Sequence, residues 1–242
     1  MADFFRRWAR RLPHALLPSS CALCGARCDG AVCRPCHAQF VTHTPRCPRC
    51  ANPAGALDAR RECAACLAQR PAFDATLAGA DYLAPLDQLV LQLKFGGRLA
   101  LAPWFAEVLR DSVLAQRGFV LPNVLCPVPL GPQRLVERGF NQALEMARPL
   151  ARHLGIPLRA RLAIRALDTR AQSGVAPDQR GRNMQNAFIV APGALAMVRG
   201  QHIGIVDDVM TSGHTLGELA ATFKRCGAAR VSNFVFARTP PH

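Results

Sequence analysis

Two adjacent carboxylates, followed by a run of hydroxyl-bearing and glycine residues, are the strongest chemical signal in the chain. Asp207 and Asp208 end an apolar segment. The loop that follows contains Thr211, Ser212, Gly213, His214 and Thr215. Carboxylates accept hydrogen bonds from ribose hydroxyls, and backbone N–H groups at the start of a helix bind anions. The spacing therefore predicts a sugar-phosphate site, with the acid pair on the sugar and the loop on the 5′-phosphate.

The residues before the acid pair indicate how it is positioned. Ile203, Ile205 and Val206 are β-branched, which suits a buried strand of a parallel sheet. Open α/β sheets bind their ligands at the carboxyl ends of such strands. As an alternative, Thr215 and Glu218 could form only a capping box on an ordinary helix. We favour the ligand site, because two carboxylates at a buried strand end cost folding free energy unless they bind a polar partner.

A second chemical signal lies in the cysteines of the N-terminal region. Eight of the eleven form four Cys-x-x-Cys pairs: Cys21/Cys24, Cys33/Cys36, Cys47/Cys50 and Cys63/Cys66. One such pair points two thiolates at one metal ion, and two pairs complete a tetrahedral zinc site. The pattern predicts two structural Zn²⁺ sites with every ligand position filled. The other cysteines are expected to be packing or core residues, not catalytic groups; they are Cys28, Cys126 and Cys226.

The cysteine pairs leave alternatives open. Disulfides are disfavoured because the chain shows no export signal, and iron–sulfur ligation is the weaker metal hypothesis. Sequential pairing would join the first pair with the second and the third with the fourth. Cross-braced pairing would join the first with the third. We favour sequential pairing, because shorter loops have a smaller closure entropy.

Strand-like and helix-like segments alternate through the rest of the chain. Strands are expected at 73–84, 124–128, 162–167, 187–190, 203–206 and 231–237. Helices are expected at 86–93, at 103–114, in a segment that follows Gln142 and ends at about 153, and at 215–226. This alternation predicts an α/β fold with a parallel sheet flanked by helices. The expected domains are a basic arm or helix at 1–20, a double zinc-ribbon module at 21–70 and an α/β domain at 73–242.

Length and charge narrow the class of protein. The 242 residues suit one medium domain and a small module, and no apolar run is long enough for a transmembrane helix. No signal peptide is evident, so we expect a cytoplasmic protein. The formal net charge is +14, and two zinc ions on eight thiolates would lower it to about +10. A basic chain favours anionic partners such as nucleic acid or polyphosphates, although a basic surface without a specific partner is an equal alternative.

The segment 203–216 resembles the phosphoribosyl diphosphate (PRPP) motif of type I phosphoribosyltransferases, with Ser212 in place of a threonine. Nearly the whole chain resembles the ComF family, which is associated with competence and DNA uptake in bacteria. Besides the cysteine pairs, the resemblance rests on Leu93-Lys94-Phe95, Pro127-Val128-Pro129-Leu130, Arg138-Gly139-Phe140-Asn141-Gln142, Thr169-x-x-Gln172, Arg180-x-x-Asn183 and Ala187-Phe188. The chain departs from the family at Leu167-Asp168, near which a basic residue is common.

The resemblance implies a type I phosphoribosyltransferase core that binds PRPP with Mg²⁺. Asp207 and Asp208 would be the catalytic acids, placed beside a ribosyl cation that forms as pyrophosphate leaves. Pyrophosphate would be received by Val128, Pro129, Leu130, Arg134 and Arg138. A loop at 168–183 with Thr169, Gln172, Arg180 and Asn183 would close over the site.

Two functions of different classes follow from this resemblance. The chain could be an enzyme that transfers the phosphoribosyl group to an acceptor which the sequence does not identify. Alternatively, it could be a non-catalytic sensor of PRPP or a nucleotide that binds single-stranded DNA and works with DNA-uptake proteins.

Overall fold

A computed structural model describes residues 19–42, 44–55, 61–116, 118–166 and 187–240. The chain divides into two compact units, residues 1–42 and 43–242. The first unit contains the short antiparallel strands β1 (Ser19–Ser20) and β2 (Arg27–Cys28), followed by helix α2 (Arg34–Phe40). Within the described ranges, no helix is long and apolar enough to cross a membrane.

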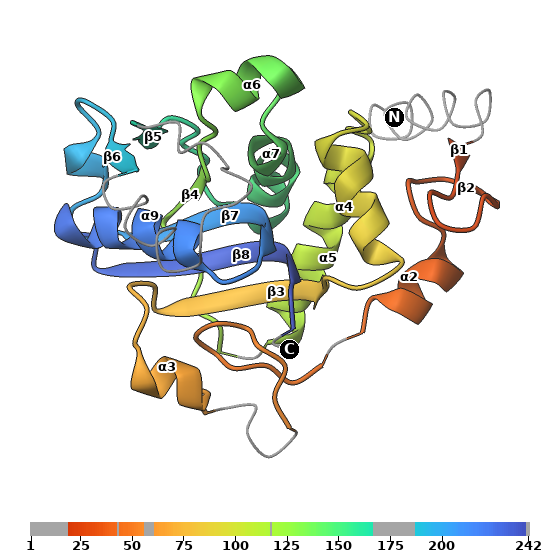
Figure 1. Cartoon of the computed structure of the whole chain (residues 1–242), viewed down its shortest axis with the longest axis horizontal. Coiled ribbons are helices and arrows are strands. Elements are labelled where there is room, and N and C mark those ends of the chain that lie inside the picture. Colours follow the sequence, from red (N-terminus) through yellow and green to blue (C-terminus); the bar gives the residue numbers. More distant parts are fainter. Residues whose placement is uncertain (1–18, 43, 56–60, 117, 167–186, 241–242) are drawn as a thin grey trace, which may run out of the picture. The chain divides into compact units, whose positions relative to one another are not determined.

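A four-stranded parallel sheet forms the centre of the second unit (Figure 1). Its order is β3 (Ala75–Asp81), β8 (Arg230–Arg238), β7 (His202–Met210) and β4 (Val124–Pro127). Nearly every residue of these strands is buried, as the apolar runs in the sequence predict for a sheet covered on both faces. The predicted parallel α/β fold is confirmed.

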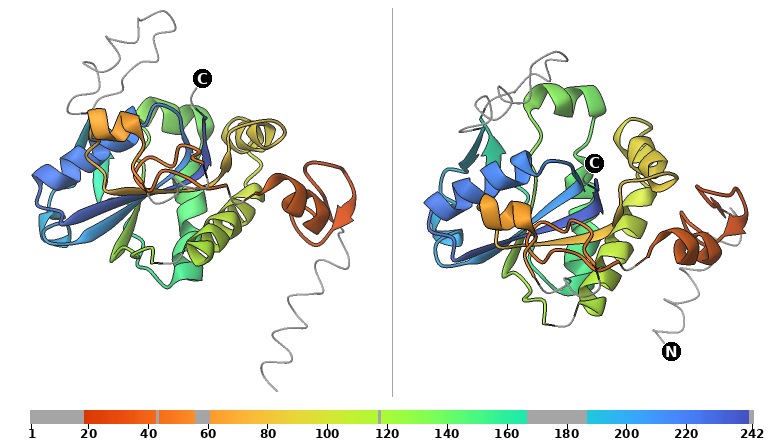
Figure 2. Two further views of the ribbon diagram at one scale, coloured as in Figure 1. Left: turned by 90° about the horizontal axis from the view of Figure 1, so that it is seen from below. Right: turned by 60° about the horizontal axis from the view of Figure 1, so that its bottom comes forward.

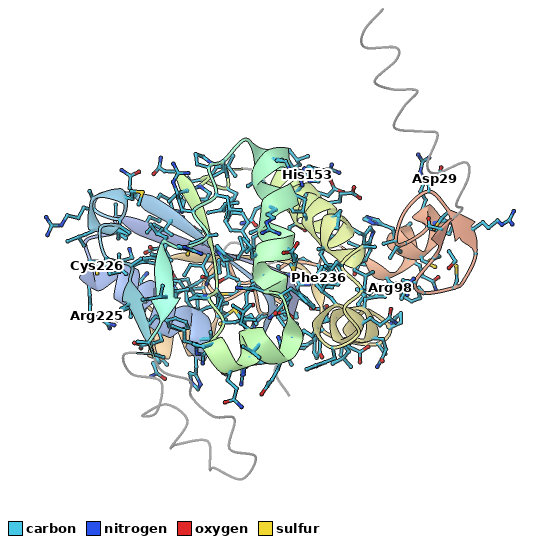
Figure 3. The ribbon with its side chains drawn as sticks, turned by 90° about the horizontal axis from the view of Figure 1, so that it is seen from above. Asp29, Arg98, His153, Arg225, Cys226 and Phe236 are labelled. Carbon is cyan, nitrogen blue, oxygen red and sulfur yellow. The ribbon has the colours of Figure 1, made fainter. Side chains whose placement is uncertain are left out.

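Helices cover both faces of this sheet (Figure 2). Helices α5 (Leu101–Ala115) and α7 (Gln142–Leu154) pack together on one face, and α9 (His214–Arg225) lies on the other. Aromatic side chains fill the first of these layers, where Phe105 of α5 stacks on Phe236 of β8 with ring centroids 3.7 Å apart. Figure 3 shows Phe236 in the interior and Arg225, at the end of α9, at the edge.

Two features differ from the expected pattern. β5 (Ala163–Arg165) and β6 (Phe188–Val190) do not join the main sheet but form a separate antiparallel pair. Helix α6 (Pro132–Arg138) was not predicted, because it buries none of its residues and therefore lacks an apolar stripe. A short 3₁₀ helix, η2 (Leu195–Met197), precedes β7.

The second group of cysteine pairs is attached to the sheet domain by polar contacts. Arg46 Nη1 lies 2.8 Å from Asp81 Oδ1, and Arg49 Nη1 donates to the Phe73 carbonyl over 2.7 Å. This segment ends in helix α3 (Ala64–Ala68) and belongs to the same compact unit as the sheet. The domain boundaries expected from the sequence remain a prediction.

Candidate functional site

The acid pair lies near the carboxyl end of β7, an inner strand of the sheet. Both carboxylates are buried, and Asp208 is only 2% exposed. The backbone N–H of Asp208 donates to Asp207 Oδ1 over 2.9 Å, which fixes one carboxylate against the strand. The strand continues to Met210, four residues beyond the predicted strand end at Val206. Parallel pairing with β4 and β8 thus holds the acids on a rigid element.

Lys94 supplies a cation to this pair. Lys94 is the last residue of α4 (Leu86–Lys94), and its Nζ lies 2.7 Å from Asp208 Oδ2. Sequence reasoning noted Lys94 as part of a family motif but gave it no role. The rarity of lysine could have drawn attention to it, because Lys94 and Lys224 are the only lysines among 30 basic residues. In the structure, each of the two is ion-paired with an aspartate.

The neighbouring acid is affected by burial. Burial raises the pKa of Asp207 well above its usual range, and the charge of Asp208 raises it further. The charge of Lys94 acts in the opposite direction and lowers that pKa. The ionisation of Asp207 therefore depends on the charges of both neighbours, Asp208 and Lys94. A ligand that brings positive charge or hydroxyl donors would favour the ionised form of Asp207.

The loop after β7 leads directly into α9. Gly213 is the N-cap of α9 and has a φ of 84°, a left-handed conformation that favours glycine. Among the described residues no side chain caps this helix, and Thr215 lies inside it, so the capping-box alternative for Thr215 and Glu218 is wrong. The first N–H groups of a helix have no intrahelical partner, and the helix dipole makes that end attractive to anions. Thr211, Ser212 and His214 are exposed beside it.

The segment Arg138–Gln142 ties three parts of the site together. Gly139 ends α6 with a φ of 74°, and the Asn141 side chain caps α7 by accepting from the Ala143 and Leu144 N–H groups. Asn141 Nδ2 also donates to the Val128 carbonyl over 3.0 Å. Asn141 therefore fixes the start of the segment Val128, Pro129 and Leu130 that follows β4. The Val128 N–H in turn donates to the Val206 carbonyl of β7.

Arg138 is a second cation near the acid pair. Its Nη1 donates to Gln142 Oε1 over 3.0 Å, and its guanidinium carbon lies 5.1 Å from the centre of the Phe95 ring. Burial lowers the pKa of Arg138, whereas the negative charge of Asp208 raises it. Arg134 is half-buried on the same helix. The other residues expected to bind pyrophosphate lie outside the described residues; they are Thr169, Gln172, Arg180 and Asn183.

A cavity of about 420 Å³ lies beside the loop. One wall comes from the second group of cysteine pairs and α3, with Cys50, Asn52 and Gln69. The opposite wall comes from the loop and the first turn of α9, with Ser212 and His214. The cysteine-rich segment therefore borders the predicted phosphate-binding loop, which the sequence did not indicate.

The eight paired cysteines form two clusters. The first cluster is Cys21, Cys24, Cys33 and Cys36, and the second cluster is Cys47, Cys50, Cys63 and Cys66. Within each cluster the sulfur atoms lie within 4.8 Å of one another, so the pairing is sequential, as favoured from the sequence. A tetrahedral zinc site with Zn–S bonds near 2.3 Å has sulfurs about 3.8 Å apart.

The sulfur distances fit this geometry. Cys24 Sγ lies 3.7 Å from Cys33 Sγ, and Cys50 Sγ lies 3.6 Å from Cys63 Sγ. Backbone N–H groups also point at the sulfurs, as in the contact of 3.3 Å from Cys63 N to Cys47 Sγ. Such contacts stabilise thiolates, the form that binds metal. Both clusters fit structural Zn²⁺.

Of the remaining cysteines, Cys126 is fully buried in β4, and burial raises its pKa to about 12. Cys226 packs against the core and is partly buried. Both observations agree with core roles and not with a catalytic thiol.

Comparison with protein families separates two regions of the chain. Residues 141–241 match the phosphoribosyl transferase domain, and residues 12–67 match the double zinc ribbon domain. Among solved structures, glutamine PRPP amidotransferase of B. subtilis aligns with 57% of this chain and 26% of its own, at 17% identity. The TM-score of this alignment is 0.38.

Two bacterial proteins are similar over most of their length. The DNA utilization protein YhgH of Salmonella typhi is 35% identical over 229 residues, which cover 92% of this chain and 98% of that protein. Competence protein F of Haemophilus influenzae is 30% identical over 186 residues, which cover 74% and 79%. Since a double zinc ribbon and a phosphoribosyl transferase domain occur together in a chain with such relatives, this protein belongs to the ComF family.

Proposed function

We propose that the protein binds PRPP at the carboxyl end of its sheet and transfers the phosphoribosyl group, with pyrophosphate as the leaving group. The observation that carries this proposal is the buried acid pair on β7, which precedes by a few residues the glycine-capped start of α9. Buried carboxylates suit ribose hydroxyls, and the helix start suits the 5′-phosphate. The domain match over 141–241 supports the same ligand class.

The cations near the acid pair support a role for pyrophosphate. Arg134 and Arg138 on α6 and the backbone of Val128–Leu130 would receive the leaving group. Arginine suits this task because its planar fork matches phosphate oxygens. Asn141 would hold the Val128 carbonyl in place while the ligand exchanges. As the bond to pyrophosphate breaks, the charges of Asp207 and Asp208 would stabilise the ribosyl cation.

Mg²⁺ is the metal that this ligand implies, and the donor set fits it. Mg²⁺ prefers oxygen ligands and binds through one or two carboxylates together with substrate phosphates. Asp207 and Asp208 provide such oxygens. When bound, the metal would neutralise charge on the pyrophosphate. Lys94 would have to share Asp208 with the incoming ligand, because its Nζ lies 2.7 Å from Oδ2 of that carboxylate.

Calorimetry with PRPP tests the proposal. Binding should require Mg²⁺ and should be lost in the Asp207→Asn, Asp208→Asn double variant, with the circular dichroism spectrum unchanged. Asp111→Asn is the control, since that acid lies on α5 and pairs with the adjacent Arg110. Unchanged affinity in the double variant would refute the site. Pyrophosphate release from bound PRPP would identify an enzyme, whereas binding without release would identify a sensor.

A link to DNA handling is the second proposed function. The relatives carry the names DNA utilization protein and competence protein, and the chain has a formal charge of +14. Single-stranded DNA is the proposed nucleic acid, with DNA-uptake proteins as partners. Binding by arginines would be electrostatic, because aromatic residues make up only 6% of the chain and leave few stacking platforms.

A further inference from the structure

Arg238 joins the second cysteine cluster to the phosphate loop. It is the last residue of β8 and is only 7% exposed. Its Nε donates to the Cys50 carbonyl over 3.0 Å, and its Nη1 donates to the Met210 carbonyl over 3.0 Å. Nη1 also contacts the carbonyls of Thr211 and Thr239. One side chain therefore bridges a zinc-ligand residue and the first residue of the loop.

The charge of Arg238 points to the same cluster. Among the described residues, no carboxylate lies within ion-pair distance of this guanidinium. A buried charge requires compensation, and four thiolates with one Zn²⁺ leave a net negative charge. The second cluster provides such a charge next to the Cys50 carbonyl that Arg238 contacts. The carbonyls of Met210, Thr211 and Thr239 accept from Nη1 of the same guanidinium.

The contacts of Arg238 lie at the point where the chain passes from β7 into the loop. Met210 and Thr211 precede the left-handed Gly213 by three and two residues, so they set the direction in which the chain enters the loop. Met210 also packs near Gly213, where a Cβ would lie 2.6 Å from Met210 Cε. The cavity beside the loop is walled by the same cluster on its other side. The loop is thus held between β8 and the second cysteine cluster.

We propose that Arg238 is a positioning residue through which the metal-bound second cluster holds the phosphate loop in its ligand-binding conformation. The proposal rests on the proposed function for the identity of the ligand, but not for the coupling itself. Loss of metal from the second cluster, followed by protonation of the released thiolates, would free the Cys50 carbonyl and remove the counter-charge of Arg238. The loop would then loosen, although none of its own residues had changed. The first cluster lies in the other compact unit and should have no such effect.

Hydrogen exchange of the ligand-free protein tests the coupling directly. Two variants are compared: Cys50→Ser with Cys63→Ser in the second cluster, and Cys24→Ser with Cys33→Ser in the first. Each should lose one of two zinc ions, as measured by metal analysis. Only the second-cluster variant should exchange the amides of residues 211–216 about tenfold faster, the effect of losing roughly one hydrogen bond. Equal exchange in both variants would overturn the proposal.

Arg238→Lys keeps the test decisive if the second-cluster variant fails to fold. Lysine keeps the charge but cannot contact the Cys50 and Met210 carbonyls with a fork. This variant should retain both zinc ions and still show faster exchange at 211–216, with about tenfold weaker binding of ribose 5-phosphate. Wild-type exchange at the loop in Arg238→Lys would refute the role of Arg238. If the wild type does not bind ribose 5-phosphate, the proposed function fails, and the exchange data still decide the coupling.

Discussion

The buried Asp208 is ion-paired with Lys94, whereas Asp207 beside it has no ion-pair partner among the described residues. Lys94 Nζ lies 2.7 Å from Asp208 Oδ2. Asp207 receives a backbone hydrogen bond from Asp208 but bears the repulsion of the neighbouring charge. Burial and this repulsion both disfavour the ionised form of Asp207 and raise its pKa. At the residue scale, the site should therefore trade stability for binding.

Replacing Asp207 by Asn should stabilise the ligand-free protein at pH 7 by about 1 kcal/mol. The folded pKa of Asp207 is raised above the unfolded value near 3.8, so the folded state holds a proton that the unfolded state releases. Stability from this group is present below that value and falls as pH rises through the folded pKa. Urea unfolding between about pH 4 and pH 7 should show a flatter pH dependence in Asp207→Asn. A variant less stable than the wild type at pH 7 would contradict this expectation.

The two lysines provide a matched pair of substitutions. Lys94→Met should destabilise the protein by about 3 kcal/mol, because it leaves the buried Asp208 without its cation. Lys224→Met removes a more exposed ion pair with Asp74 and should cost about 1 kcal/mol or less. Urea unfolding at neutral pH measures both values. Equal losses would mean that Lys94 does not carry the charge balance of the site.

At the scale of elements, the start of α9 offers an internal control. Gly213→Ala should destabilise the protein by about 1–2 kcal/mol, since alanine resists a φ of 84°. Gly217 lies one turn later in the same helix, and no atom stands within 4 Å of a Cβ added there. Gly217→Ala should therefore stabilise by about 1 kcal/mol, as expected for a helix interior. Thermal unfolding of both variants checks the opposite signs.

Asn141 links an element to the site, and its two contacts can be separated. Asn141→Asp keeps an oxygen that caps α7 but loses the donor to the Val128 carbonyl. Asn141→Ala loses both and should cost about 1 kcal/mol more, the usual value of an N-cap. Calorimetry should show weakened pyrophosphate binding in both variants. Full affinity in Asn141→Asp would mean that the tether to Val128 does not matter.

How much of this was predictable depends on the range of the interactions. The strand and helix around 203–226 could be predicted, because β-branched residues, a glycine and helical spacing follow one another directly. The antiparallel pairing of β5 and β6 could not, since two three-residue strands carry too little pattern to show which sheet they join. Helix α6 could not be predicted either, because its apolar residues Leu135 and Val136 are exposed and form no buried stripe at helical spacing.

The candidate site was predictable where a motif is contiguous and not where it is assembled by folding. The acid pair, the loop and the cysteine clusters could all be recognised from spacing. Lys94 meets Asp208 across the fold, and Arg238 meets the Cys50 carbonyl across 188 positions. Each contact joins residues that are far apart in the sequence, so no local sequence pattern marks it. Spacing alone therefore could not assign the two cations to the site.

At the scale of the whole molecule, the charge makes a prediction about nucleic acid. Affinity for a labelled single-stranded oligonucleotide should fall steeply between low and physiological salt, because each phosphate contact releases counter-ions. Replacing Arg134 or Arg138 by Gln should reduce the salt slope, and excess PRPP should compete if both ligands use the same cations. Arg110→Gln, on α5, serves as the control. No binding at low salt would remove single-stranded DNA as a ligand.

The place of β8 in the sheet has a consequence for synthesis on the ribosome. β8 lies between β3 and β7, yet it follows both of them in the chain, and Thr76 meets Asn233 across 157 positions. An emerging chain therefore holds β3 without its partner strand until residues 230–238 have left the exit tunnel. Long-range pairing of this kind folds slowly and exposes strand edges. Arg238 is the last residue of the same strand. A nascent chain that ends before it would therefore lack both the strand that pairs with β3 and the side chain that holds the loop. We expect chaperones and proteases to act on such a chain.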